Sequence, residues 1–213
     1  MINYLEGLNE PQKAAVLHKE GPLMIIAGAG SGKTRVLTHR IAHIIHEGAK
    51  AHQVMALTFT NKAAGEMRER IEKIVGSEAR YLWMGTFHSI FAKILRFEAR
   101  HLGYDSNFSI YDTDDSKSLI KSIVKERNLD DKIYKPSIVL NRISSAKNRL
   151  IGSQSYQTNP VLLEDDRSNQ RPEISKLYEI YQRRCEQANA MDFDDLLFKT
   201  NVLFQQHPEV LAE

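Results

Sequence analysis

The sequence predicts an α/β domain with a parallel sheet and helices on both faces, followed by a mainly helical subdomain. Over residues 1–90, short runs that are apolar on both faces alternate with amphipathic helical patterns, as buried parallel strands and their connecting helices do. After about residue 90 the strand patterns nearly vanish while helical patterns continue. The chain of 213 residues is long enough for one large domain or two small ones.

The first half contains three predicted strands and two predicted connecting helices. The strands are residues 23–26, 54–59 and 81–84, and the helices are residues 34–47 and 61–75. One face of the first helix carries its spaced apolar residues, which are Leu37, Ile41, Ile44 and Ile45. Alternating strands and helices predict a parallel sheet with right-handed crossovers.

The second half is predicted to be helical. Helices are expected over residues 88–102, 112–127, 136–151, 173–189 and 192–206, with a very short strand at 108–110. Polar composition and two prolines predict a long loop over residues 152–172. The basic side chains of the helix that starts at Pro136 are expected to be solvated, namely Arg142, Lys147 and Arg149. Cys185 is expected to be a half-buried helix residue.

Composition limits the cellular setting and the class of partner. No apolar run approaches the roughly 20 residues that cross a bilayer, and the N-terminus lacks a secretory signal pattern. The single cysteine, Cys185, fits a reducing cytosol, so we expect a cytoplasmic protein without a membrane contact. A net charge of +2 permits a polyanionic partner but does not require one.

Residues 27–34, AGAGSGKT, resemble a phosphate-binding loop. The usual formula is G-x-x-x-x-G-K-[ST], and here Ala27 takes the place of the first glycine. Small residues allow successive backbone N–H groups to wrap phosphates, and here they are Gly28, Ala29, Gly30, Ser31 and Gly32. Lys33 would hold the β and γ phosphates, and the Thr34 hydroxyl would ligate Mg²⁺. The alternative is a ligand-free strand-to-helix turn, which the lysine and threonine argue against.

Aromatic and amide side chains stand near predicted strand and helix ends. Gln12 lies at a helix start capped by Asn9, and its amide matches the donor and acceptor edge of adenine. Its alternative role is that of an ordinary surface glutamine. Phe59 follows a predicted strand, where an aromatic ring is a stacking platform for nucleic-acid bases. Phe193 stands in an acidic helix start.

Five segments, taken in order, resemble the N-terminal motifs of UvrD/Rep/PcrA-like superfamily 1 DNA helicases. They are LNEPQ, AGAGSGKT, LTFTNKAAGEMRERI, GTFHSI and MDFDDLL. They are similar to the Q motif, motifs I, Ia and Ib, and the motif just before the Walker B strand. The resemblance covers nearly the whole chain, and alanine in the first loop position is usual in that family.

The resemblance implies an ATP- and Mg²⁺-dependent motor that moves 3′-to-5′ on single-stranded DNA and unwinds duplex at single-strand/duplex junctions, in repair or replication. Residues 1–88 would begin a RecA-like ATP-binding core domain, residues 89–190 would form a helical inserted subdomain, and residues 191–213 would return toward the core. Gln12 would read adenine, Arg35 would pack against the base, and Lys33 and Thr34 would act in catalysis. The residues expected to touch DNA are Phe59, Asn61, Thr86, His88 and Phe193.

The family's Walker B strand should follow MDFDDLL, but the sequence ends at Glu213 first. Residues 161–166, VLLEDD, are rejected as that strand because three apolar residues in a polar, proline-flanked region make a poor buried strand. The second RecA-like domain and its arginine finger, worth ~10³ to 10⁵ in rate, are also absent from the sequence. We therefore expect a helicase fragment that binds nucleotide weakly and does not unwind DNA.

Two other functions compete with this interpretation. A different P-loop ATPase or kinase would leave LTFTNK and GTFHS unexplained, and a non-catalytic single-strand-binding module would bind DNA independently of Lys33. The spacing of His39, His43 and His46 can bind a metal, but a solvated helix face is the preferred interpretation. Helix capping, and not calcium or nuclease chemistry, is expected for two acidic clusters, Asp112–Asp115 and Asp192, Asp194 and Asp195.

Overall fold

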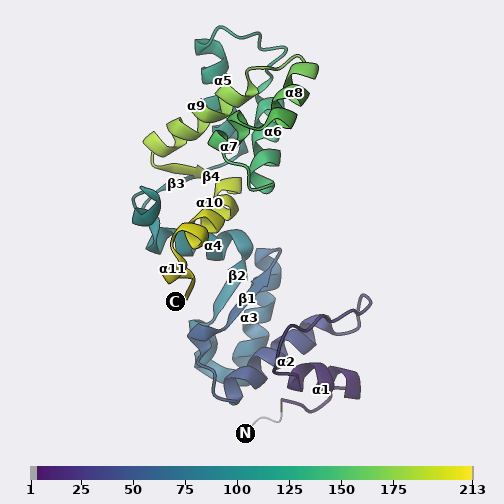
Figure 1. The fold of residues 1–213 in the computed structure, drawn as a ribbon. Helices are drawn as coiled ribbons and strands as arrows, with labels where there is room; N and C mark the ends of the chain where they lie inside the picture. Colours follow the sequence, from purple (N-terminus) through teal and green to yellow (C-terminus); the bar gives the residue numbers. More distant parts are fainter. Residues whose placement is uncertain (1–3, 213) are drawn as a thin grey trace. The chain divides into compact units, whose positions relative to one another are not determined.

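The computed structural model describes residues 4–212, which form two compact units divided within helix α4 (Phe87–Phe97) (Figure 1). The first unit ends at Ile90 and the second begins at Phe91. Both units combine helices with a small parallel sheet, so the chain is a mixed α/β protein. Across the described residues, every helix is too short or too polar to span a membrane.

The first unit is built around one strand–helix–strand element, formed by β1 (Met55–Thr58), α3 (Asn61–Val75) and β2 (Trp83–Thr86). The elements of the whole unit are, in chain order, α1 (Glu10–Leu17), α2 (Lys33–His46), η1 (Ala51–Gln53), β1, α3, η2 (Gly76–Tyr81) and β2. Strands β1 and β2 are parallel, with Thr58 opposite Thr86. Because α3 packs against α2 and both strands, these elements enclose one apolar core, formed by Ile41, Ala51, Ala56, Met67, Ile71, Ala79, Leu82 and Met84.

The predicted strand over residues 23–26 is wrong for this structure. The segment has no regular secondary structure, and the side chains of Met24 and Ile26 are 81% and 89% exposed. A strand needs a neighbour for its backbone N–H and C=O groups, and β1 and β2 are paired with each other. The burial expected for this apolar run is therefore also wrong, because no described strand lies beside it. Leu37, expected on the buried face of α2, is also exposed.

The second unit contains six α-helices that follow α4, together with two short strands. In chain order, after η3 (Ala99–Leu102), they are β3 (Ser109–Tyr111), α5 (Thr113–Glu126), α6 (Pro136–Asn148), α7 (Ser153–Gln157), α8 (Pro160–Ser168), α9 (Ile174–Gln187), β4 (Ala190–Asp192) and α10 (Phe193–Gln206). A short terminal helix, α11 (Pro208–Ala212), adds a seventh. Strands β3 and β4 are parallel, with Ile110 opposite Met191.

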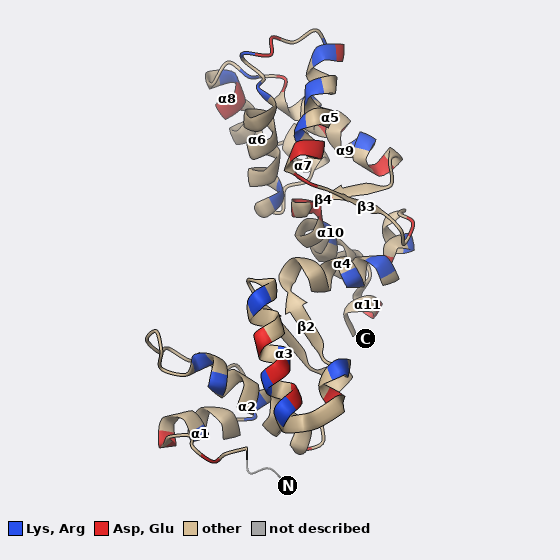
Figure 2. Cartoon of the chain, turned by 180° about the vertical axis from the view of Figure 1, so that it is seen from behind, with Lys and Arg blue, Asp and Glu red and all other residues tan. Residues whose placement is uncertain are grey.

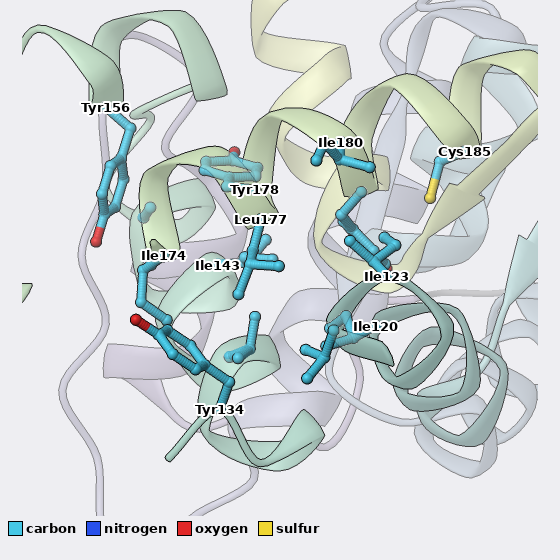
Figure 3. Packing of buried hydrophobic residues seen from close by; sticks show 14 of the residues in the cluster. Ile120, Ile123, Tyr134, Ile143, Tyr156, Ile174, Leu177, Tyr178, Ile180 and Cys185 are labelled. Carbon is cyan, nitrogen blue, oxygen red and sulfur yellow. The ribbon is translucent and has the colours of Figure 1, made fainter. Parts of the chain in front are cut away.

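Helix α9 supplies the main apolar face of the second unit (Figure 3). Ile174, Leu177 and Tyr178 point into a core shared with α5 and α6, as the spacing of these residues predicts. The same core holds Cys185, which is fully buried and not half-buried as expected. Burial raises the pKa of the Cys185 thiol to about 12, so the thiol stays protonated at neutral pH.

Residues 152–172 are mostly helical, so the predicted long loop is wrong. Helix α8 begins at Pro160 and is capped by Asn159, whose side chain accepts a hydrogen bond from the Leu162 N–H. The VLLEDD segment lies in this helix, which confirms its rejection as a Walker B strand. Asp166 ties the helix to the unit by accepting hydrogen bonds from Arg142 and from the Tyr156 hydroxyl.

Two basic side chains of α6 that were predicted to be solvated are not. Arg142 donates to the Tyr156 hydroxyl at 2.7 Å and to Asp166 at 3.0 Å. The Lys147 side chain is fully buried, and its Nζ lies 2.7 Å from Asp192 Oδ2 and 2.9 Å from Asp195 Oδ1. Arg149 is exposed, as expected. The charged partners of α6 come from distant segments, and helical periodicity alone does not reveal them.

The acidic clusters cap helices, as predicted. The Asp112 side chain accepts hydrogen bonds from two backbone N–H groups at the start of α5. Asp192 and Asp195 form a reciprocal capping box at the start of α10. Asp192 therefore has three structural partners: the helix start, the buried Lys147 ammonium and the Tyr181 hydroxyl.

Candidate nucleotide and nucleic-acid site

The phosphate-loop segment forms a tight turn that leads into α2. Gly30 and Gly32 have φ angles of +77° and +87°, a backbone conformation that favours glycine. Gly32 is the N-cap of α2, so the first backbone N–H groups of the helix face the loop. Gly28 and Gly30 have open space on their Cβ side, which leaves that side of the loop accessible to a ligand.

Lys33 lies folded over the loop. Its Nζ donates to the carbonyl oxygens of Ala27 at 2.8 Å and Gly28 at 2.7 Å. The Gly28 carbonyl also accepts from the Ser31 hydroxyl, which closes the turn around exposed Ala29. The ammonium is therefore held at the loop by neutral oxygens, which a phosphate oxygen can replace with a stronger charge-assisted contact. Thr34 is exposed next to it at the helix start.

Gln12 contacts the loop and is not an unattached surface residue. Asn9 caps α1 and exchanges hydrogen bonds with Gln12, as the sequence predicted. The Gln12 amide Nε2 then donates to the Ser31 carbonyl at 3.1 Å. A Cβ at Gly32 would lie 2.9 Å from the same Nε2 and would move the Gln12 amide, and the φ of +87° at this position itself favours glycine. Residues far apart in sequence thus meet at the loop.

Arg35 is exposed on the first turn of α2, and its Cβ lies on the Gly32 side of the loop. Its guanidinium approaches Gly7, where an added Cβ would lie 2.8 Å from Nη2. Helix α2 contains no acidic residue, and basic residues mark its first half (Figure 2). The helix dipole and these cations together favour an anion at the start of α2.

Four of the five residues predicted to bind DNA, namely Phe59, Asn61, Thr86 and His88, gather at one edge of the first sheet. Because β1 and β2 are parallel and in register at Thr58 and Thr86, the residues after both strands lie side by side. Phe59 is 92% exposed, and its ring centroid lies 5.8 Å from that of Phe87. The sequence analysis did not predict Phe87 as a contact, although each strand ends in threonine and is followed directly by phenylalanine.

Helix starts occupy the same edge. The Thr60 hydroxyl caps α3 by accepting from the Ala63 N–H, and exposed Asn61 is the first residue of that helix. Thr86 accepts from the Ser89 N–H at the start of α4, where His88 is half-buried. A helix start with unpaired N–H groups can bind a nucleic-acid phosphate.

Two further residues complete the description of the predicted DNA contacts, Gly85 beside them and Phe193 in the second unit. A Cβ at Gly85 would lie 2.4 Å from Ser89 Oγ, so a larger residue there would displace the hydroxyl that donates to the Thr86 carbonyl. Phe193, the remaining predicted DNA contact, belongs to the second unit, where it begins α10 and is 55% exposed.

The histidines of α2 pack around Tyr4, so the predicted solvated face is wrong for part of this group. His43 is buried, and its Nδ1 lies 2.9 Å from the Tyr4 hydroxyl. His39 Nδ1 contacts the Tyr4 carbonyl, and the His46 ring lies against the Tyr4 ring. Burial lowers the pKa of His43 below its usual value. The regular spacing of these three histidines therefore serves packing against Tyr4.

Comparison with known proteins identifies the family of the chain. The chain matches the UvrD/REP helicase N-terminal domain over residues 8–213. It is 48% identical over 208 residues to the ATP-dependent DNA helicase UvrD1 of Mycobacterium tuberculosis and 45% identical to the ATP-dependent DNA helicase PcrA of Staphylococcus aureus. Each match covers 97% of the chain but only 27% or 28% of the relative's length. The chain therefore belongs to the UvrD/REP helicase family, whose N-terminal domain it matches.

Proposed function

We propose that the chain is the nucleotide-binding and strand-contacting N-terminal part of an ATP-dependent helicase that moves 3′-to-5′ on single-stranded DNA and unwinds duplex at junctions. One observation carries the proposal: the first unit holds both a glycine-rich turn at a helix start and an exposed aromatic edge on a parallel sheet. ATP is the ligand for the turn, and single-stranded DNA is the ligand for the edge. The whole protein acts in DNA repair or replication, in the cytoplasm.

The loop residues fit a nucleoside triphosphate with Mg²⁺. Backbone N–H groups from Gly28 to Gly32 and the α2 start would surround the phosphates. Lys33 would exchange its two carbonyl contacts for phosphate oxygens, and the exposed Thr34 hydroxyl supplies the kind of oxygen ligand that Mg²⁺ accepts. The bound ion would neutralise phosphate charge. Gln12 and Arg35, which both approach Gly32, would contact the adenine base.

We also propose the domain assignment that the family implies. Residues 1–88 would begin a RecA-like core domain. Residues 89–190 would form a helical inserted subdomain, and residues 191–213 would lead back toward the core. The exposed apolar side chains of Met24 and Ile26 support an apolar neighbour from elsewhere in the whole protein. A second RecA-like domain would complete the motor.

Replacing Lys33 with alanine is expected to weaken binding of a fluorescent ATP analogue at least about tenfold, because a charge-assisted phosphate contact is lost. Oligo-dT affinity, measured by fluorescence anisotropy, should change little. Lys73→Ala, in the last turn of α3, is a matched control that should retain both ligands. Equal nucleotide binding by wild type and Lys33→Ala would refute the phosphate-loop assignment. Nucleotide binding without any DNA binding would favour a different P-loop ATPase or kinase.

Replacing Phe59 with alanine is expected to weaken oligo-dT binding about tenfold, because a stacked base contributes ~1–3 kcal/mol. The melting temperature should not change, since the ring is 92% exposed. Tyr81→Ala removes another exposed aromatic ring, located before β2 and not after it, and should bind oligo-dT normally. If the two variants bind alike, the aromatic edge is not the DNA site.

A further inference from the structure

We propose that His101, His207 and Glu209 bind one divalent transition-metal ion of the zinc type, at a site separate from the proposed ATP and DNA contacts. Each side chain offers one ligand atom, and these atoms all lie within 4.8 Å of one another. Across residues 4–212, no other set of three or more His, Cys, Asp or Glu side chains meets this distance. The helical trio His39, His43 and His46 does not.

The three ligands come from segments that are distant in sequence but adjacent in the second unit. His101 lies in η3, His207 follows the last residue of α10, and Glu209 lies in α11. The two imidazole centroids are 4.3 Å apart. His207 Nδ1 lies 2.9 Å from Glu209 Oε1, so one histidine and the carboxylate already point at each other.

An apolar core fixes the backbone on both sides of the cluster. Ala99 is buried in a core that also contains buried Leu203, and Leu102 and Val210 pack against it. Two backbone hydrogen bonds fix the turn around His207, from its own N–H to the Leu203 carbonyl and from the Val210 N–H to its carbonyl. The ligands are thus carried by ordered backbone, which lowers the entropy cost of bringing them together.

The donor set selects the class of ion. Two imidazoles and one carboxylate form the ligand set of open zinc sites, where water takes the fourth position. Imidazole nitrogens suit zinc and its transition-metal neighbours, whereas Mg²⁺ and Ca²⁺ prefer oxygen ligands. The single cysteine is buried elsewhere in the unit, so it does not compete for the ion.

A further carboxylate lies next to the cluster. The Nε2 atom of His101 lies 3.4 Å from Glu98 Oε2, close enough for this carboxylate to orient the imidazole ring. On the other side, the ion would replace the proton between His207 Nδ1 and Glu209 Oε1. Metal–ligand bonds of about 2.0–2.1 Å place tetrahedral ligands about 3.4 Å apart, so this pair opens by about 0.5 Å. The proton leaves to solvent, so affinity should fall in acid.

Binding would tie η3 to the end of α10 and to α11. The His101 and Glu209 side chains are 39% and 64% exposed, so an ion can enter from solvent without opening the core. Since the ligands are brought together only in the folded unit, zinc should raise its stability by mass action. The prediction concerns a structural ion and is independent of nucleotide and DNA binding.

The test is isothermal titration calorimetry of the tag-free 213-residue chain with zinc chloride, repeated with Co²⁺ to obtain the visible spectrum of the bound ion. We expect one saturable site per chain that a chelator reverses. His101→Gln, His207→Gln and the exposed Glu209→Gln should each weaken it at least about tenfold, since even supporting partners of a metal ligand cost 10–100-fold. His52→Gln, an exposed histidine in the first unit, is the matched control and should bind normally.

Circular dichroism checks that each variant is folded before titration. No saturable zinc uptake by the wild-type chain would overturn the proposal. So would unchanged affinity in all three ligand variants, or a loss of binding in His46→Gln, which would place the ion at the α2 histidines. Binding of the fluorescent ATP analogue should stay the same in every ligand variant, so failure here leaves the proposed function standing.

Discussion

Replacing Lys147 with methionine is expected to destabilise the second unit by about 3–5 kcal/mol, the usual loss when one partner of a buried ion pair is removed. The Lys147 side chain is fully buried between Asp192 and Asp195, whose side chains are 5% and 0% exposed. Methionine fills similar volume, so the expected loss comes from charge and not from a cavity. Two carboxylates would remain in a site that water does not reach.

Urea unfolding measured by far-ultraviolet circular dichroism gives the free energy of unfolding, with Lys125→Met on α5 as an exposed control. Fluorescence of Trp83, the single tryptophan, reports unfolding of the first unit. Its urea midpoint should be the same in Lys147→Met as in the wild type. Adding Asp192→Asn and Asp195→Asn to Lys147→Met should recover part of the loss, because the unpaired charges disappear. A loss below about 1 kcal/mol in the single variant would show that the buried charges are solvated.

The sequence was most informative where local rules decide the structure. Helix α3 begins at Asn61 and ends at Val75, the predicted bounds, because an amphipathic pattern between a threonine cap and a glycine defines it locally. The capping roles of Asn9, Asp112 and Asp192 were also predictable from residue type and position. Family resemblance then supplied the expected roles of the loop and edge residues, which still require binding measurements.

Local rules failed where the partner of a residue is distant in sequence. The apolar run at residues 23–26 predicts a buried strand, but these residues are exposed and have no neighbouring strand in the structure. Lys147 stands in a helix that also carries Arg142 and is followed directly by Arg149, and only the fold reveals Asp192 as its partner. The contact between Gln12 and Ser31, and the cluster around His101, are equally non-local. Such pairings are set by the packing of whole elements.

The pKa values of the two carboxylates beside Lys147 are shifted in opposite directions. Burial raises the pKa of Asp192, but the charge of Lys147 and hydrogen bonds from Lys147, the Asp195 N–H and Tyr181 outweigh it, so the net pKa is lowered. Burial raises the pKa of Asp195 by more than Lys147 lowers it. Within the described residues Asp195 Oδ1 accepts no hydrogen bond, although it lies 2.9 Å from Lys147 Nζ. As pH falls, Asp195 therefore takes up a proton before Asp192 does.

We therefore expect Asp192→Asn to cost about 2–3 kcal/mol at neutral pH, as for a buried hydrogen bond to a charged group. Asp195→Asn should cost less than about 1 kcal/mol, because it removes an unfavourably buried charge and keeps an oxygen for the capping bond. Asparagine can also keep the Asp192 cap, so the difference between the variants isolates the carboxylate charge.

The pH dependence distinguishes the two carboxylates because their folded-state pKa values shift in opposite directions. With its folded pKa below the unfolded value of about 3.8, Asp192 stabilises the unit above that pH, and the contribution is lost as pH falls through the folded pKa. The folded-state pKa of Asp195 is raised. Asp195 therefore contributes to folding stability below its unfolded pKa, and this stability is lost as pH rises through the folded pKa. Urea unfolding from pH 7 down to about pH 3 should therefore show the deficit of Asp192→Asn shrinking in acid. A larger loss in Asp195→Asn at neutral pH would reverse the assignment and make Asp195 the principal counterion of Lys147.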